Sequence, residues 1–403
     1  MNNEHLPLKG LKIIALEQYG AAPFGTMFLA DLGADVIKVE NHLTGGEMGR
    51  HVVPYSEDGD SLFFQSFSAN KRSIGLNIKS SNGRKILDKL VSSSDALINN
   101  LRGDLVNKLG LNYKSFSKHK PEIVCVHLSA YGRNNSRASW PGLDYVMQAE
   151  AGYLSVTGEP SSPPTRFGLS IVDYQAGLTA ALALLAGILG AQRTGRGQDY
   201  DAALFDVAMT NLSYPATWHL TEGYKPERIA RSGHPSLVPS ELYKTKNGWI
   251  FIMANKDSFW PKLVTAIEKP QWIKDPRISD FKSRLKNRQL VVELLSEVFI
   301  KENTEYWLSK LTGLLPCAPV NNIESALSNK FSDERMITQK ISHPKWQNMK
   351  VVRQPILADE NVLPRKKAPL LGEDTINILK EIGYEEEEIN TLLSDKTIFS
   401  QII

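Results

Sequence analysis

Residues 11–40, LKIIALEQYGAAPFGTMFLADLGADVIKVE, decide the fold class. The compact apolar run Leu11–Leu16 has the length of a buried strand, and a turn of small residues follows it. Pro23–Leu32 carries its apolar side chains at helical spacing, with a proline in the first turn and Gly33 as a C-terminal stop. Asp35–Glu40 then has the composition of a second strand. The stretch therefore predicts one βαβ unit, which is right-handed in nearly all proteins.

The same alternation of strand and helix continues after this unit. Three further runs have the character of strands: Ser73–Ile78, Ala96–Asn99 and Glu122–Leu128. Four apolar residues form one stripe of an expected helix between them: Ile86, Leu87, Leu90 and Val91. Strands that alternate with helices favour an α/β fold with a parallel, Rossmann-like sheet.

The composition of the sequence changes from about Gly223 onward, where glycine, proline and serine become frequent. Leu242–Lys244 and Trp249–Met253 flank a KNG turn and predict a β-hairpin. A helical stretch, Leu290–Lys310, follows, and the prolines and asparagines of 314–322 predict a loop. We therefore expect a large Rossmann-like domain over 1–222, a smaller α+β domain over 223–325, and a C-terminal segment returning to the large domain over 326–403.

The composition of the 403 residues is that of a globular protein, with 42% hydrophobic and 23% charged residues. Lys plus Arg number 47 and Asp plus Glu 44, so we expect neither nucleic acid nor a membrane as partner. The two cysteines exclude a disulfide framework and a cysteine-rich metal site, and they fit a cytoplasmic location. The longest apolar stretch, 176–191, is shorter than the roughly 18 to 20 residues that span a bilayer, and it predicts a buried helix.

The motifs of the common enzyme classes are absent from this sequence. It contains no Walker A loop, no HExxH, no GxSxG and no CxxC, and we predict no metal site. The turn at 17–23, EQYGAAP, holds one glycine in place of the three of the dinucleotide-binding fingerprint. An NAD-linked oxidoreductase is therefore a weak alternative.

Asp173 is the most informative acidic residue, because it stands immediately before the apolar stretch and has apolar neighbours. One interpretation is a helix N-cap, a position at which aspartate is strongly favoured. The other is a nucleophile: the helix N-terminus holds the carboxylate ionised while it sits beside buried surface.

Five blocks of the sequence together resemble the class III CoA-transferase family, which includes formyl-CoA transferase and carnitine CoA-transferase. They are residues 7–40, SANKRSIGLNIK at 68–79, the Asp173 segment, RTGRGQDYDAALFD at 193–206 and APLLGED at 368–374. The first block and NKRSIGLN are specific to this family and its racemase relatives. The match runs through nearly the whole chain in the right order.

The resemblance implies a reaction and an assembly. The carboxylate of Asp173 attacks an acyl-CoA thioester to give a mixed anhydride, and the CoA thiolate then converts the anhydride to an aspartyl-CoA thioester. An incoming carboxylic acid opens this thioester, and the new acyl-CoA leaves. The family works without a prosthetic group, with coenzyme A and acyl-CoA as substrates, and its members form interlocked homodimers.

The CoA contacts of the family carry over to three short stretches and two single residues of this chain. They fall on Gly20 and Ala21, on Leu76, Asn77, Ile78 and Lys79, on Asn100, Leu101 and Arg102, and on Lys108, with Asp144 as a pocket acid. Three of these residues are cations suited to the phosphates of CoA: Lys79, Arg102 and Lys108.

The chain also departs from the family pattern. Asn41 replaces an arginine of formyl-CoA transferase, which puts one phosphate contact in doubt, and the polyglycine lid of that enzyme is missing. The related 2-methylacyl-CoA racemases have GHD where this chain has Gly142-Leu143-Asp144, so the histidine base is absent and the racemase alternative is disfavoured. A CoA-binding protein without catalytic activity remains a further alternative.

Overall fold

The computed structural model describes residues 6–401, and the chain forms two compact units. The large unit comprises 6–151, 168–212 and 333–401, and the small unit comprises 152–167 and 213–332. The small unit therefore starts ten residues before the boundary expected at 223 and includes one earlier segment. Arg228 explains this inclusion, because its guanidinium donates hydrogen bonds to the carbonyl oxygens of Ser162 and Pro163.

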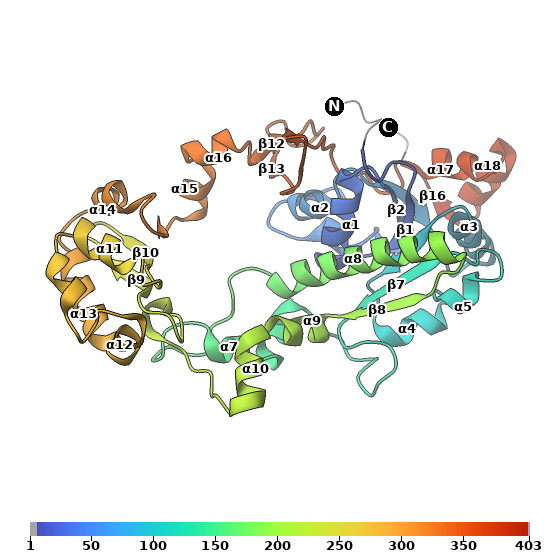
Figure 1. Ribbon diagram of the computed structural model, residues 1–403. Coiled ribbons are helices and arrows are strands. Elements are labelled where there is room, and N and C mark those ends of the chain that lie inside the picture. Colours follow the sequence, from blue (N-terminus) through green and yellow to red (C-terminus); the bar gives the residue numbers. More distant parts are fainter. Residues whose placement is uncertain (1–5, 402–403) are drawn as a thin grey trace. The chain divides into compact units, whose positions relative to one another are not determined.

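A seven-stranded sheet forms the centre of the large unit within the described chain (Figure 1). Its strands follow the order β16 (Ile398–Phe399), β5 (Arg72–Leu76), β2 (Asp35–Glu40), β1 (Lys12–Leu16), β6 (Ala96–Asn99), β7 (Val124–Ser129) and β8 (Asp199–Ala203). All pairs are parallel except β16 with β5, as expected for a Rossmann-like sheet. Strand β2 lies beside β1 on one edge, and the chain later crosses back to place β6 beside the other edge of β1. This reversal is the topological switch point, where ligands bind in open α/β sheets.

Helices flank this sheet. One apolar core joins β1, the helix α3 (Ser81–Ser92) and the C-terminal helix α17 (Thr375–Glu381). The predicted stripe of α3 is fully buried in it. Two other helices, α1 (Ala21–Asp31) and α8 (Ile171–Thr194), pack against each other in the same unit (Figure 1). The other helices of the large unit named below are α2 (Leu62–Phe67), α4 (Gly103–Lys108), α5 (Tyr113–Phe116), α6 (Asp144–Glu150) and α9 (Leu204–Asn211).

The prediction of a buried helix over 176–191 is wrong for one of its faces. Ala180 and Leu184 of α8 are buried, whereas Leu182 is 68% exposed. The buried face consists mostly of small residues together with Leu184 and Ile188, whereas Leu178, Leu182 and Leu189 lie on the exposed face. Among the described residues, α8 alone has the length and apolar composition to cross a membrane, and 44% of its apolar window is buried.

The small unit contains a three-stranded antiparallel sheet. The predicted hairpin is present as β9 (Ser240–Lys244) and β10 (Trp249–Met253). The loop predicted at 314–322 instead contributes a third strand, β11 (Cys317–Pro319), because Cys317 pairs with Ile252 of β10. The single helical stretch expected over 290–310 is two helices, α13 (Arg288–Phe299) and α14 (Thr304–Leu311).

Candidate active site

The β1–α1 turn and the start of α8 meet at Asp173. The two helices approach closely because both carry glycine at the crossing: a Cβ on Gly25 would lie 2.0 Å from the carbonyl oxygen of Gly177. The first turns of α1 and α8 are therefore neighbours. A Cβ on Gly20 would lie 3.5 Å from Oδ2 of Asp173, so the carboxylate faces this turn.

Asp144 completes the start of α8. Its Oδ2 accepts hydrogen bonds from the amides of Val172 (2.7 Å) and Asp173 (3.0 Å), and its Oδ1 accepts one from Nε2 of Gln148 (2.6 Å). The N-cap position belongs to Ser170, whose side chain makes no capping hydrogen bond. The N-cap interpretation of Asp173 is therefore wrong, because a carboxylate from α6 performs that task and leaves Asp173 free of it.

Aromatic rings cluster beside Tyr174, the residue that follows Asp173. The ring of Phe24 lies 4.8 Å from that of Tyr174 and 6.2 Å from that of Phe67, centroid to centroid. Burial, and secondly the charge of Asp144, raise the pKa of Asp173 to about 7. The helix N-terminus favours the ionised form, so here burial outweighs the effect that the sequence led us to expect.

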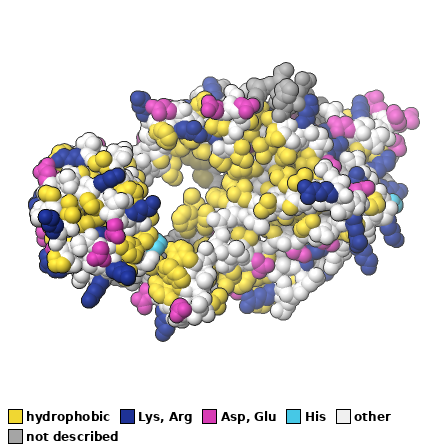
Figure 2. Space-filling view, viewed as in Figure 1, with side chains coloured by type: hydrophobic (Ala, Val, Ile, Leu, Met, Phe, Trp, Pro, Cys, Tyr) yellow, Lys and Arg dark blue, Asp and Glu magenta, His cyan; other side chains and the backbone are white. Residues whose placement is uncertain are grey.

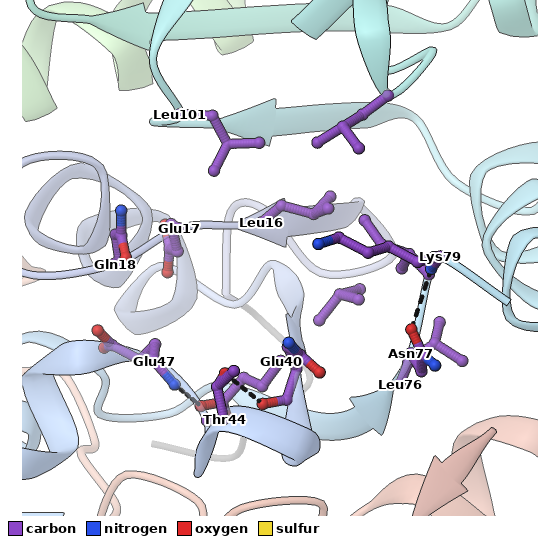
Figure 3. A pocket seen from close by; sticks show the side chains of 15 residues that line it. Leu16, Glu17, Gln18, Glu40, Thr44, Glu47, Leu76, Asn77, Lys79 and Leu101 are labelled. Carbon is purple, nitrogen blue, oxygen red and sulfur yellow. Dashed lines mark hydrogen bonds between the residues drawn. The ribbon is translucent and has the colours of Figure 1, made fainter. Parts of the chain in front are cut away.

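A cavity of about 220 Å³ lies at the carboxyl ends of β1, β2, β5 and β6, which is the switch point of the sheet (Figure 3). Five of the predicted CoA contacts line it: Leu76, Asn77, Ile78, Lys79 and Leu101. Residues that the sequence reasoning did not select also line it: Leu16, Glu17, Gln18, Val39, Glu40, Thr44, Gly46, Glu47 and Leu109. Its volume is below that of a pocket for a whole drug-sized ligand, so it has room for one portion of a CoA molecule.

The remaining predicted contacts do not line this cavity. Gly20 precedes and Ala21 begins α1. The side chain of Asn100 accepts a hydrogen bond from the amide of Gln18 (2.9 Å) and donates one to its carbonyl oxygen (2.7 Å), so Asn100 fixes the β1–α1 turn.

Two of the predicted cations are held by one carboxylate. Arg102 and Lys108 each donate to Asp104 at 2.7 Å, and these hydrogen bonds, from Arg102 and then Lys108, lower the pKa of Asp104 to about 2. Asn41, which replaces the family's arginine, does line the cavity, and its side chain accepts from the amide of Leu43 (3.2 Å).

The sequence reasoning missed a buried charged cluster beneath the cavity. Its members are Glu17, Lys38, Glu40, Glu47, Arg50 and Lys71, all at most 7% exposed. Glu17, Glu40 and Glu47 are visible in Figure 3. One signal was available, since Lys38 and Glu40 stand in a strand whose neighbours in the sheet are apolar, where an unpaired charge would be costly. In the part of the chain that the structure covers, no group of three or more His, Cys, Asp or Glu side chains is placed to hold a metal ion.

A parallel sheet with a cavity at its switch point, and a half-buried carboxylate against the β1–α1 turn, defines an α/β enzyme fold with a group suited to nucleophilic or proton-transfer chemistry. The sequence matches the model of CoA-transferase family III over residues 8–375. The chain belongs to this family, and it is a CoA-transferase.

Named relatives and a solved structure agree. The chain is 30% identical to succinyl-CoA:glutarate CoA-transferase of Homo sapiens, covering 98% of this chain and 90% of that protein. It is 29% identical to succinyl-CoA:mesaconate CoA-transferase of Haloarcula marismortui, covering 94% and 97%. The crystal structure of a CAIB/BAIF family protein from Brucella suis superposes with a TM-score of 0.80 at 28% identity, over 93% of this chain and 99% of that one.

Proposed function

We propose that this enzyme moves CoA from a dicarboxylic acyl-CoA, with succinyl-CoA as the first donor to test, to a free dicarboxylate. The observation that carries the proposal is the carboxylate of Asp173, which lies half-buried against the Gly20 turn, with a raised pKa, in a chain of this family. The human and Haloarcula relatives, whose names specify succinyl-CoA with glutarate and with mesaconate, support this substrate class.

Asp173 is the nucleophile in the proposed mechanism. Its ionised oxygen attacks the thioester carbonyl, the C–S bond breaks, and CoA leaves as a thiolate, which gives a mixed anhydride. The thiolate attacks the aspartyl carbonyl and displaces the donor acid, leaving an aspartyl-CoA thioester. The acceptor carboxylate attacks this thioester and frees the thiolate, which then attacks the acyl carbonyl. The new acyl-CoA forms and the Asp173 carboxylate returns, with no net proton consumed.

The raised pKa of Asp173 suits this chemistry. A carboxylate with a pKa of about 7 is more basic than an exposed one, and it is still substantially ionised near neutral pH.

CoA is proposed to occupy the cavity at the switch point. The apolar side chains of Leu76, Ile78 and Leu101 offer a surface for the adenine ring, and Lys79 offers an ammonium for a phosphate. We propose the remaining contacts as the resemblance gives them. They are Gly20, Ala21, Asn77, Asn100, Arg102, Lys108 and Asp144, of which Arg102 and Lys108 would share their charge between Asp104 and phosphate.

We also propose that the enzyme is a cytoplasmic homodimer, interlocked as in the family. One face of α8 supports a partner, because Leu178, Leu182 and Leu189 are 41%, 68% and 53% exposed. Figure 2 shows broad areas of hydrophobic side chains on the displayed face of the large unit. Cys125 and Cys317 are free thiols, as in a reducing compartment.

Trapping of the covalent intermediate tests the nucleophile. The protein is mixed with succinyl-CoA, treated with hydroxylamine or borohydride, and analysed by intact-protein and peptide mass spectrometry. We expect a modification at Asp173 that disappears in the Asp173→Asn variant together with CoA exchange. Asp206→Asn is the matched control, because Asp206 also stands in the first turn of a helix, α9, but is exposed. Full exchange by Asp173→Asn would refute the mechanism.

A further inference from the structure

Six charges are buried behind the β1–α1 turn, and they balance: three carboxylates and three cations. A buried ion cluster costs desolvation energy that its pairing barely repays, so such a cluster is weak evidence for a role in stability. The cluster borders both the cavity and the turn that faces Asp173. This position suggests a role in shaping the site.

Lys71 is the member of the cluster that joins the most segments. Its Nζ donates to Oε1 of Glu17 (2.6 Å), to the carbonyl oxygen of Pro23 (3.0 Å) and to the carbonyl oxygen of Phe67 (3.0 Å). An ammonium has three donors, and all three are used. Lys71 thus ties together the residue that follows β1, the first turn of α1 and the last residue of α2.

The tied segments surround the Gly20 turn, which faces the nucleophile. Pro23 is two residues after the start of α1, and the ring of Phe67 would lie 3.9 Å from a Cβ on Gly20. Glu17 is itself held by the hydroxyl of Thr26 on α1, which donates to its Oε2 at 2.7 Å.

Another member of the cluster fixes the turn from its other end. Oε2 of Glu47 accepts the amide hydrogen of Tyr19 at 3.0 Å, and Tyr19 has a φ of 59°. This left-handed conformation is unfavourable for tyrosine and persists only where its surroundings impose it. The turn beside Asp173 is therefore maintained by the buried cluster rather than by local preference.

We propose that Lys71 is a positioning residue for CoA transfer, whose ammonium holds the β1–α1 turn and α2 in the arrangement that presents Gly20 and Phe67 to the Asp173 carboxylate. The inference rests on the proposed function, with Asp173 as nucleophile. Lys71 acts through Glu17, Pro23 and Phe67, and its contribution is the alignment of the reacting groups.

The charge of Lys71 provides a signature of this role. Burial, opposed by the charge of Glu17, lowers the pKa of Lys71 to about 8. The other charged groups that face Lys71 are Lys38 on β2, Glu47 in the segment between β2 and α2, and Asp31 on α1. Loss of the proton removes one of the three hydrogen bonds, so kcat falls as the pH rises through about 8.

The test compares variants of the full chain over pH 6 to 10, with kcat and KM for transfer from succinyl-CoA, CoA binding and thermal unfolding as readouts. The single variant Lys71→Met leaves the buried Glu17 without its closest cation, which could unfold the protein. The double variant Glu17→Gln/Lys71→Met removes both charges of the pair and avoids this cost. We expect kcat of the double variant to be about 10- to 100-fold lower and its CoA affinity to stay within about twofold of the wild type. Its pH profile should also lack the alkaline limb, which is the fall in kcat above about pH 8. Lys71→Arg, which stays charged, retains part of the activity and moves the limb to higher pH. Lys114→Met, at an exposed site on α5, leaves all parameters unchanged.

The outcomes separate the two proposals. If the wild type is trapped on Asp173 but the double variant keeps kcat within about twofold, or Lys71→Arg keeps the limb at the same pH, the positioning role is refuted. If the wild type gives neither transfer nor an adduct with any acyl-CoA, the proposed function fails and the role of Lys71 fails with it.

Discussion

Two aspartates meet at the start of α8, and their environments give them different tasks. Asp144 accepts three hydrogen bonds, two of them from backbone amides of α8. Asp173 stands among aromatic rings with its carboxylate against Gly20. The two carboxylates therefore differ in their contacts: Asp144 orders the start of α8, and the carboxylate of Asp173 is left to face the β1–α1 turn.

Asp144→Asn tests the coupling of the pair. The substitution removes the neighbouring charge and keeps one oxygen to accept an amide of α8, so the pKa of Asp173 falls from about 7 but stays raised by burial. Since the ionised carboxylate is the nucleophile, the acid limb of the rate of adduct formation moves to lower pH. The pH dependence of trapping at Asp173 measures this, and an acid limb that stays in place or rises would contradict the coupling.

Asp173→Asn is expected to stabilise the fold. Its folded pKa of about 7 lies above the unfolded value near 3.9, so the contribution of this group to stability is fully present below about pH 4 and is lost as the pH rises through 7. The variant lacks this loss and gains about 2 kcal/mol at pH 8, a figure reduced from the full shift to allow for solvent screening. Thermal unfolding at pH 4 and pH 8 checks the sign: the variant and wild type differ at pH 8 and coincide at pH 4. A gain of the same size at both pH values would point to a cause other than titration.

At the scale of elements, the crossing of α1 and α8 holds the site together. Gly25→Ala places a methyl group 2.0 Å from a backbone carbonyl oxygen, which has no room to withdraw, so the helices must separate. We expect a loss of about 1 to 3 kcal/mol in the free energy of unfolding by urea, with CoA transfer reduced in step because Asp173 lies beside the crossing. Gly190→Ala on the same α8 is the control: nothing lies within 4 Å, and the better helix former is neutral or stabilising by about 0.5 to 1 kcal/mol. Equal effects of the two substitutions would contradict the packing argument.

Five of the parallel strands are predictable from the sequence because each carries its signal locally, whereas β8 was not predicted. Ala96–Asn99 is found with the predicted bounds, and α1 contains the predicted first-turn proline. The two-residue strand β16 and the three-residue β11 carry no comparable signal, because their pairing partners lie far away in the chain. The exposed face of α8 was also beyond reach, since a uniformly apolar stretch does not specify which side it buries.

The residues of the site also fall into those that the sequence predicts and those that it does not. Asp173 is visible in the sequence through its position before an apolar helix and through the family resemblance, and the Leu76–Lys79 stretch follows from the resemblance alone. The capping of α8 by Asp144 joins residues 28 and 29 positions apart, and the clamp by Lys71 reaches back 54 residues to Glu17. Such contacts arise from the tertiary fold, so no local pattern predicts them.

At the scale of the molecule, the C-terminal segment of the large unit packs against the N-terminal part of the same unit. His343 bonds to Asp60 at 3.1 Å, and the amide of Ser73 donates to Asp374 at 2.9 Å. Arg365 pairs with Asp31 on α1. The large unit therefore depends on residues from both ends of the chain.

Leu182→Glu tests the proposed homodimer. An apolar stripe that remains 41% to 68% exposed on one helix is unusual for a monomer, and a second copy of the chain would bury it. A carboxylate placed there costs little in a lone chain, because the position faces water, but it opposes desolvation at an interface. We therefore expect sedimentation to show a dimer for the wild type and a shift toward monomer for Leu182→Glu, with an unchanged circular dichroism spectrum. Ile300→Glu, at a site 44% exposed in the small unit, serves as the control for adding a charge to an exposed apolar position and leaves the dimer intact. A wild type that sediments as a monomer would show that the leucine face of α8 has another occupant.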